Sequence, residues 1–428
     1  MRLSFPTRPS SVLAWTVVVA GCADHQERAS AREGLQPSDP SPYLYVWAGD
    51  ADRREGDQDF LIVVDADPDN GSFGEVISTA PVGSTGSRPH HAEPVAPQDG
   101  LLFANGFAGD RTFLFDLDSP SQPVVAGELE LPPDYNFLHT FLRMENGHVL
   151  TTAQEGGRDN PGTVGGLVEF DAEGGFVQAG SAAAEGYETI RPYAIDLFPE
   201  TDRVLSSSFS MKLERSDNVV QLWRLSDLTL LATVPVPEID QATDPPCYLD
   251  EWVDGDDCTV DRVAGHDRTF EIRRLTQDLA ILNTLSCGFY AVSGIQSGTL
   301  ELEAIMNWPD MVLCGVTTVV GDYYIVPVGA SDRVISVDIS APLHPVPVDT
   351  VYVGEGFRPH WAQVDPGTNR FILTGNGPSG PMVRLYHVDA ETGAITPDEG
   401  FGALDMNREV WPHGATGPAA PHAALFGR

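Results

Sequence analysis

Past residue 42 the chain consists of short apolar runs separated by turn residues, without the long 3.6-residue periodicity of an amphipathic helix. The clearest unit begins at Pro89-His90-His91. Its expected strands cover 91–97, 101–105, 112–116 and 123–129, with a turn at 98–100. Four strands in about 40 residues is the size of one blade of a β-propeller.

The same unit recurs along the chain. Inner-strand candidates begin near Pro89, Phe137, Ile190, Thr269, Met311, Arg358 and Val410. Apolar second strands are expected at 147–152, 203–208, 322–328 and 370–374. Third strands with polar ends are expected at 60–65, 167–171, 219–224, 334–338 and 383–389. The pattern predicts an all-β fold, a seven-bladed β-propeller.

The two ends of this region complement each other. Segments 43–48, 60–65 and 73–81 supply three strands with no inner strand before them, whereas Trp411–Gly414 resembles an inner strand without a blade. Joining them would close the ring with N- and C-terminal strands and remove the sheet edge. Residues 43–428 are therefore expected to form a single domain.

One segment interrupts the repeat. Residues 237–268 carry many acidic side chains together with Cys247 and Cys258. The acids invite a calcium interpretation, but the spacing of an EF-hand is missing. We expect a solvated insertion closed by a Cys247–Cys258 disulfide, and we expect Cys287 and Cys314 to be buried thiols.

The first residues have the features of a targeting segment. A short positive region precedes an apolar run at 12–20, which is too short to span a bilayer, and the run ends in Val19-Ala20-Gly21-Cys22. This resembles a bacterial lipobox with Cys22 as the lipidated residue; an ordinary signal peptide cleaved nearby is the alternative. We expect residues 1–22 to be a lipoprotein signal peptide and 23–42 a flexible tether. The protein would then lie in the cell envelope, on the periplasmic or cell-surface side, and contact the membrane through its lipid only.

Charge excludes one class of partner. The chain has 25 basic and 62 acidic residues, a formal net charge of −37. Such a surface repels phosphate backbones, so nucleic-acid binding is not expected. The 42% of hydrophobic residues suffices for a sizeable core.

The candidate chemistry lies in the histidines. Several of the eleven fall at or near the start of an expected inner strand: His90, His91, His139, His360 and His413. Inner strands of a propeller line its axis in one direction, so equivalent positions converge on one mouth of the channel. Tyr193 and Glu271 hold comparable positions in two other units and are expected beside the site.

Gathered imidazoles suit a transition metal, copper or another, and a nearby carboxylate could orient a ligand or accept a proton. The alternative is a wet channel in which these histidines only form hydrogen bonds. The other histidines are expected in the tether, in structural roles or at the surface: His25, His148, His266, His344, His387 and His422. No GxSxG, HExxH, P-loop or Rossmann glycine motif points to another chemistry.

Several motifs resemble one family. The runs 59–68 and 74–77, Pro89-His90-His91, 137–140 with 165–168, 219–225, Glu271-Ile272-Arg273, and Val337–Ser340 with Pro342 are similar to blocks of the selenium-binding protein and methanethiol oxidase family. The similarity extends over most of 43–414 and is weak between the motifs, as in a distant member.

The resemblance implies a seven-bladed propeller and a copper-dependent oxidase that cleaves methanethiol to formaldehyde, hydrogen sulfide and hydrogen peroxide. Carried over, it makes His90, His91 and His139 the catalytic copper ligands. The chain has Leu142 where the family has a further histidine, Arg408-Glu409 where the family has His-Glu, and lacks the cysteine loop after the paired histidines. His360 and His413 are then expected to replace lost ligands, or the site takes another metal.

Two functional classes remain open at this point. One is a metal-dependent oxidoreductase acting on a small thiol or similar molecule. The other is a non-catalytic envelope propeller that binds a protein, a ligand or a metal, since a fold does not fix a function. A lactonase-type hydrolase is a third hypothesis, and it would need a metal site of acidic side chains instead of imidazoles.

Overall fold

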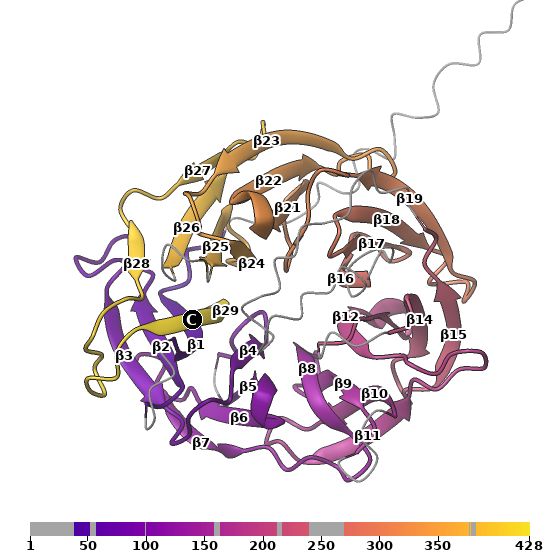
Figure 1. Cartoon of the computed structure of the whole chain (residues 1–428), viewed down its shortest axis with the longest axis horizontal. Helices are drawn as coiled ribbons and strands as arrows, with labels where there is room; N and C mark the ends of the chain where they lie inside the picture. The colour runs from indigo at the N-terminus through magenta and orange to yellow at the C-terminus, as the bar shows by residue number, and fades with distance from the viewer. Residues whose placement is uncertain are drawn as a thin grey trace, which may run out of the picture. The chain divides into compact units, whose positions relative to one another are not determined.

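The computed structural model describes residues 38–51, 57–98, 100–157, 163–211, 216–238, 269–375, 377 and 382–428. Within Asp39–Arg428 the strands form seven antiparallel sheets arranged in a ring (Figure 1). The predicted seven-bladed all-β propeller is confirmed. In the part of the chain that the structure describes, the helices are 3-10 turns of three residues, η2 (Phe107–Gly109), η3 (Pro199–Thr201) and η5 (Gly329–Ser331), and none is long or apolar enough to cross a membrane. The expected anchor at Cys22 and the Cys247–Cys258 disulfide lie outside the described residues.

Each sheet has its inner strand at the centre of the ring. The first sheet contains β29 (Ala419–Gly427), β1 (Tyr43–Asp50), β2 (Phe60–Asp65) and β3 (Val76–Pro81). The second contains β4 (Pro89–Ala92), β5 (Leu101–Gly106), β6 (Arg111–Asp116) and β7 (Val124–Glu128). The third contains β8 (Asn136–Arg143), β9 (Val149–Glu155), β10 (Val164–Phe170) and β11 (Phe176–Ser181). The fourth contains β12 (Pro192–Phe198), β13 (Arg203–Ser208), β14 (Val219–Arg224) and β15 (Leu230–Pro235).

The remaining sheets follow the same order. The fifth contains β16 (Thr269–Arg274), β17 (Leu279–Thr284), β18 (Gly288–Ser293) and β19 (Glu301–Asn307). The sixth contains β20 (Thr318–Val320), β21 (Tyr323–Val328), β22 (Arg333–Asp338) and β23 (Val346–Tyr352). The seventh contains β24 (Pro359–Val364), β25 (Arg370–Gly375), β26 (Met382–Val388) and β27 (Ile395–Pro397), with β28 (Ala403–Asp405) also paired to β26.

The second and third strands of the sheets are mostly buried on both faces, which explains their continuous apolar runs. All six residues of β2 are buried, and so are all six of β21. Between sheets one and two, Trp47 packs edge-on against Phe113 and Phe115 at ring-centroid distances of 5.6 and 5.4 Å. Such contacts between neighbouring sheets replace a single central core.

The ring closes where its first and last strands meet. Strand β29 pairs antiparallel with β1, with Tyr43 opposite Gly427 and Asp50 opposite Ala419 (Figure 1). Closure by N- and C-terminal strands is confirmed, but the expected inner strand at Trp411–Gly414 is wrong. Trp411 and Gly414 instead bridge each other in a turn. The inner strand of the sixth sheet likewise begins at Thr318 and not near Met311.

A buried ion pair ties this closure together. The guanidinium of Arg370 donates from Nε to Asp365 Oδ2 at 2.7 Å, and its two other nitrogens donate to the carbonyls of Ala66 and Ser41 at 2.8 and 2.6 Å. Asp365 also accepts bonds from the Ser41 amide and hydroxyl. This charged pair thus joins the seventh sheet to two points of the first sheet. One is Ser41, just before β1, and the other is Ala66, just after β2.

The expectation of two buried thiols is wrong, because Cys287 and Cys314 form a disulfide. Cys287 lies in the turn between β17 and β18, and Cys314 precedes β20 in the neighbouring sheet. The two residues are 27 positions apart in the sequence. The side-by-side placement of sheets five and six brings them together, and the apolar residues around each cysteine do not predict the bond.

Removing the charge at the seam should destabilise the whole ring. We expect Arg370→Met to lower the free energy of unfolding by about 3–5 kcal/mol, because it leaves the buried Asp365 charge unpaired. Arg224→Ala, which removes an exposed pair with Asp227, is the matched control and should change the free energy of unfolding much less, because solvent screens this pair. Urea titration of both variants measures the difference; equal losses would contradict a role for the seam.

Candidate metal centre

A shift of strand register occurs near the start of six inner strands: β4, β8, β12, β16, β24 and β29. In β4, for example, Pro89 is opposite Gly106 and Ala92 opposite Ala104, so two residues face one. A bulge of this kind redirects side chains and is common near functional sites. The residues within these shifts are His90 and His91, His139 and Thr140, Tyr193 and Ala194, Phe270 and Glu271, His360, and His422 and Ala423.

A polar side chain from the second strand of the sheet forms the hydrogen bonds that the backbone at the bulge cannot form within the sheet. The amide of His91 donates to Asn105 Oδ1 at 2.7 Å, and Asn105 Nδ2 donates to the Leu138 carbonyl of the next sheet at 2.6 Å. Thr152 repeats this pattern between the Thr140 amide and the Tyr193 carbonyl, at 3.0 and 2.9 Å.

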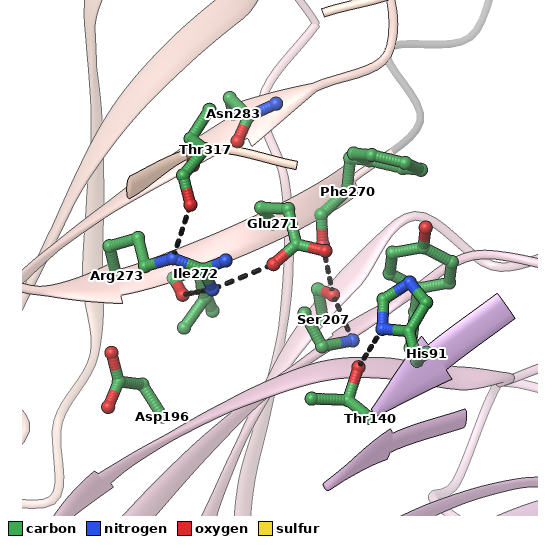
Figure 2. Close-up of polar contacts among 12 residues, drawn as sticks. His91, Thr140, Asp196, Ser207, Phe270, Glu271, Ile272, Arg273, Asn283 and Thr317 are labelled. Atoms are coloured by element: carbon green, nitrogen blue, oxygen red, sulfur yellow. Dashed lines mark hydrogen bonds and ion pairs between the residues drawn. The ribbon is translucent and has the colours of Figure 1, made fainter. Parts of the chain in front are cut away.

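Two further sheets use the same bonds. Ser207 accepts from the Ala194 amide at 3.1 Å and donates to the Phe270 carbonyl at 2.6 Å (Figure 2). Thr374 forms the second of these bonds and donates to the His422 carbonyl at 2.7 Å. These bonds link the bulge of β4 to that of β8, β8 to β12, β12 to β16, and β24 to β29.

The shared register brings five imidazoles from four sheets together. Within the described residues, two groups of three place their ligand nitrogens within 4.8 Å of one another: His90, His91 and His139, and His90, His360 and His422. The ring centroids of His90 and His422 are 3.9 Å apart, and those of His91 and His139 are 4.0 Å apart. Four of the five side chains belong to buried residues, and His360 is partly exposed.

Hydrogen bonds orient two of these rings through Nδ1. His139 Nδ1 lies 3.1 Å from the Tyr193 carbonyl oxygen, which can only accept, so this nitrogen carries the proton. His91 Nδ1 lies 3.5 Å from Thr140 Oγ1, and Figure 2 shows this contact. The Nε2 atoms of His91 and His139 are buried and have no hydrogen-bond partner among the described residues. This is the arrangement of metal-ligating histidines, whose other ring nitrogen is held by the protein.

Burial keeps the imidazoles neutral. It lowers the pKa of His139 to about 3, although the hydrogen bond to the Tyr193 carbonyl opposes the shift, and it lowers the pKa of His360 to about 4. Burial, together with the neighbouring histidines, lowers the pKa of His90, His91 and His422 well below the ordinary value. Neutral nitrogens can ligate a metal without first losing a proton. The donor set and the two unpartnered Nε2 atoms therefore fit a transition metal.

The structure places the predicted residues unequally. It brings His90, His91, His139 and His360 together, with Tyr193 against them. His413 lies elsewhere: its Nδ1 is 2.8 Å from Thr79 Oγ1, and its ring packs on Phe60. His422 lies with the other four histidines instead, although we expected it in a structural or surface role. Its preceding residue, Pro421, repeats the Pro-His pattern of the other sites, and that signal could have found it.

Aromatic side chains surround the imidazoles. The ring of Tyr193 packs against His139 at a tilt of 37°, with ring centroids 4.1 Å apart, and the Phe270 ring centroid lies 4.6 Å from that of Tyr193. Trp361 meets His91 edge-on at 4.8 Å. The Tyr193 hydroxyl is buried without a hydrogen-bond partner in the described structure. These rings limit the access of water to the centre.

Next to the imidazoles lies a buried charged group. Glu271 Oε2 is 2.7 Å from Arg273 Nη1, and Arg273 Nε donates to the Thr317 carbonyl at 2.8 Å (Figure 2). Burial raises the pKa of Glu271, while Arg273 opposes the shift. Both residues come from β16. Besides burial, the charge of Arg273 lowers the pKa of His91 and the charge of Glu271 raises the pKa of Tyr193, so the pair lies within electrostatic reach of the centre.

Fold and centre together define a β-propeller with a buried all-imidazole site. The sequence of this chain is 27% identical over 188 residues to methanethiol oxidase of Ruegeria pomeroyi; the match covers 39% of the chain and 41% of the relative. It thus spans less than half of that relative's length. The chain is a distant relative of the selenium-binding protein and methanethiol oxidase proteins, as its motifs indicated. No protein-family model matches it.

Solved structures confirm the fold. A hypothetical selenium-binding protein of Sulfolobus tokodaii superposes with a TM-score of 0.72 at 14% identity, covering 92% of this chain and 95% of that one. A periplasmic gluconolactonase of Pseudomonas aeruginosa gives 0.58 at 13% identity, covering 90% and 98%. At these identities the likeness establishes the propeller and not the chemistry.

The lowered histidine pKa values predict how metal-free protein responds to pH. An unfolded histidine has a pKa of about 6.5, whereas the pKa values of the buried histidines in the folded protein are lower. Between these two pKa values the unfolded chain binds more protons than the folded one, so stability falls as pH falls. We expect metal-free wild-type protein to lose stability between about pH 7 and 4, and His139→Gln to flatten this slope. The exposed His344→Gln is the control. Thermal melts across this range measure it, and a slope unchanged by His139→Gln would refute the link.

Proposed function

We propose that the protein is an exported copper-dependent oxidoreductase that oxidises a small thiol, such as methanethiol, to an aldehyde, sulfide and hydrogen peroxide. The observation that carries this proposal is the gathering of five neutral imidazoles from four sheets around His90. The distant relationship to a methanethiol oxidase supports the choice of reaction.

The histidines would hold the metal in one of two overlapping groups. His90, His91 and His139 match the family motif, and His90, His360 and His422 form the second group. Imidazole suits copper, and also zinc, iron and nickel. A bound copper ion would supply electron transfer between the thiol sulfur and dioxygen.

The surrounding side chains favour a small uncharged substrate. Phe270, Trp361 and Tyr193 are buried against the imidazoles, so a charged molecule would lose its hydration there without replacement. His360 is the partly exposed member of the centre, with Phe270 beside it at a ring-centroid distance of 6.2 Å. We infer that substrate enters along His360.

We also propose that the protein is exported and lipid-anchored in the cell envelope. The sequence Val19-Ala20-Gly21-Cys22 after an apolar run supports it. The Cys287–Cys314 disulfide adds independent support, because such bonds persist in oxidising compartments.

Metal analysis tests the centre directly. Purified protein loaded with copper is compared with His422→Ala and with His413→Ala, the matched control from the histidine that lies outside the centre. Loss of a hydrogen bond that supports a metal ligand weakens metal binding about 10–100-fold. His422→Ala removes a ligand itself, so we expect it to weaken copper binding by more than this. His413→Ala should bind like wild type, and equal copper affinity in all three proteins would exclude the group of His90, His360 and His422 as the metal site.

Oxygen consumption with methanethiol tests the reaction. We expect copper-loaded wild-type protein to consume dioxygen and form sulfide and hydrogen peroxide, with His422→Ala inactive and His413→Ala active. Copper binding without turnover would instead favour the non-catalytic metal-binding propeller.

The anchor has its own test. We expect Cys22→Ala to abolish labelling by radioactive palmitate and to release the protein from the membrane fraction, because the lipid is its expected membrane contact. Retention of the label in Cys22→Ala would show that the lipid is attached elsewhere.

A further inference from the structure

Glu271 occupies a special position in the channel. The register shift in β16 places Phe270 and Glu271 opposite Asn283, as the shift in β4 places His90 and His91 opposite Asn105. Glu271 is therefore the counterpart of His91, on a strand three sheets further round the ring. At the corresponding place β12 has Ala194 and β29 has Ala423.

One oxygen of this carboxyl group is bound and the other is free. Oε2 forms the ion pair with Arg273, but Oε1 is buried and has no hydrogen-bond partner among the described residues. The residue as a whole is 1% exposed. A buried carboxylate oxygen without a partner is costly, so this atom requires a bound proton or a bound molecule to explain it.

A second buried glutamate shows what a purely structural pair looks like. Glu93 on β4 receives two bonds from Arg143, at 2.8 Å each, one on either oxygen. Its Oε1 also accepts from the Phe103 amide at 3.0 Å. Both oxygens of Glu93 are thus satisfied, in contrast to those of Glu271.

Among the carboxylate and phenol groups around Glu271, its own Oε1 is the carboxylate oxygen without a hydrogen bond in the described structure. Arg273 from the same strand holds Oε2, and Tyr324 of β21 donates its hydroxyl proton to Asn283 Oδ1 at 3.0 Å. From β12, Tyr193 carries its own proton, and Asp196 accepts from the Arg274 and Leu197 amides, one on each oxygen. Burial raises the pKa of Glu271, which strengthens it as a base toward a weak acid such as a thiol.

We propose that Glu271 accepts the proton of the thiol bound at the histidine centre, an inference that rests on the thiol chemistry proposed above. The S–H bond breaks with its electron pair left on sulfur, and the proton forms an O–H bond with Oε1. The carboxylate becomes a carboxylic acid, and no oxidant enters this step. Arg273 is the positioning residue, because it fixes Oε2 and leaves Oε1 as the proton site.

Proton counting during thiol binding tests this assignment. Methanethiol is added without oxygen to copper(I)-loaded protein, and calorimetry in buffers of different ionisation enthalpy gives the protons released. We expect about zero protons per thiol for wild type and for the control Glu93→Gln, and about one for Glu271→Gln, in which the thiol proton must leave for the buffer. Equal release by wild type and Glu271→Gln overturns the inference alone, whereas absence of thiol binding to wild type overturns the proposed function with it.

Infrared difference spectra locate the proton and guard against a folding defect. The C=O band of a protonated carboxyl should appear when thiol binds to wild type and be missing in Glu271→Gln. Glu271→Asp keeps the charge beside Arg273 and should show the band at a displaced frequency. A band that Glu271→Asp leaves in place would assign the proton to another group and refute the inference.

Discussion

The candidate centre depends on hydrogen bonds to the bulged backbone near the start of the inner strands, six of which have a bulge. A bulge leaves an amide without its ladder partner, and a buried amide must be bonded. Asn105, Thr152 and Ser207 accept that amide and donate to an inner-strand carbonyl of the next sheet. The bulges of neighbouring sheets are thereby held to one another, and residues far apart in sequence come together. Replacing Asn105 or Ser207 by an apolar residue would remove the hydrogen bonds to two buried backbone groups at once.

Much of this could be predicted from the sequence, because strands in a propeller leave local signals. The expected strands at 203–208 and 219–224 coincide with β13 and β14, and four of the five gathered histidines were identified from their place at inner-strand starts. His413 and His422 could not be told apart by the Pro-His pair that both carry. What separates them is the following sequence: glycine after His413 favours a turn, whereas the apolar run 423–426 after His422 sustains a strand. The Cys287–Cys314 bond left no local signal, since only the packing of two sheets creates it.

The chain as a whole is strongly acidic, but several buried carboxylates of the propeller are paired with arginines. Three arginines are each paired with a buried carboxylate: Arg370 with Asp365, Arg143 with Glu93, and Arg273 with Glu271. In the first two pairs both carboxylate oxygens have hydrogen-bond partners, with Ser41 completing those of Asp365. The third leaves Oε1 of Glu271 without a partner among the described residues. A buried carboxylate oxygen of this kind is suited to accepting a proton, because the low local dielectric makes an unpaired polar group costly.

Strand β29 has two roles: it completes the first sheet by pairing with β1, and it positions His422 beside His90 and His360. During synthesis this strand is the last part of the ring to become available. Until it docks, the molecule has an open sheet edge and only the imidazoles of the other sheets. A chain that stalls or is trimmed before β29 would therefore lack His422 as well as its seam, so that the complete set of five imidazoles exists only in a closed ring.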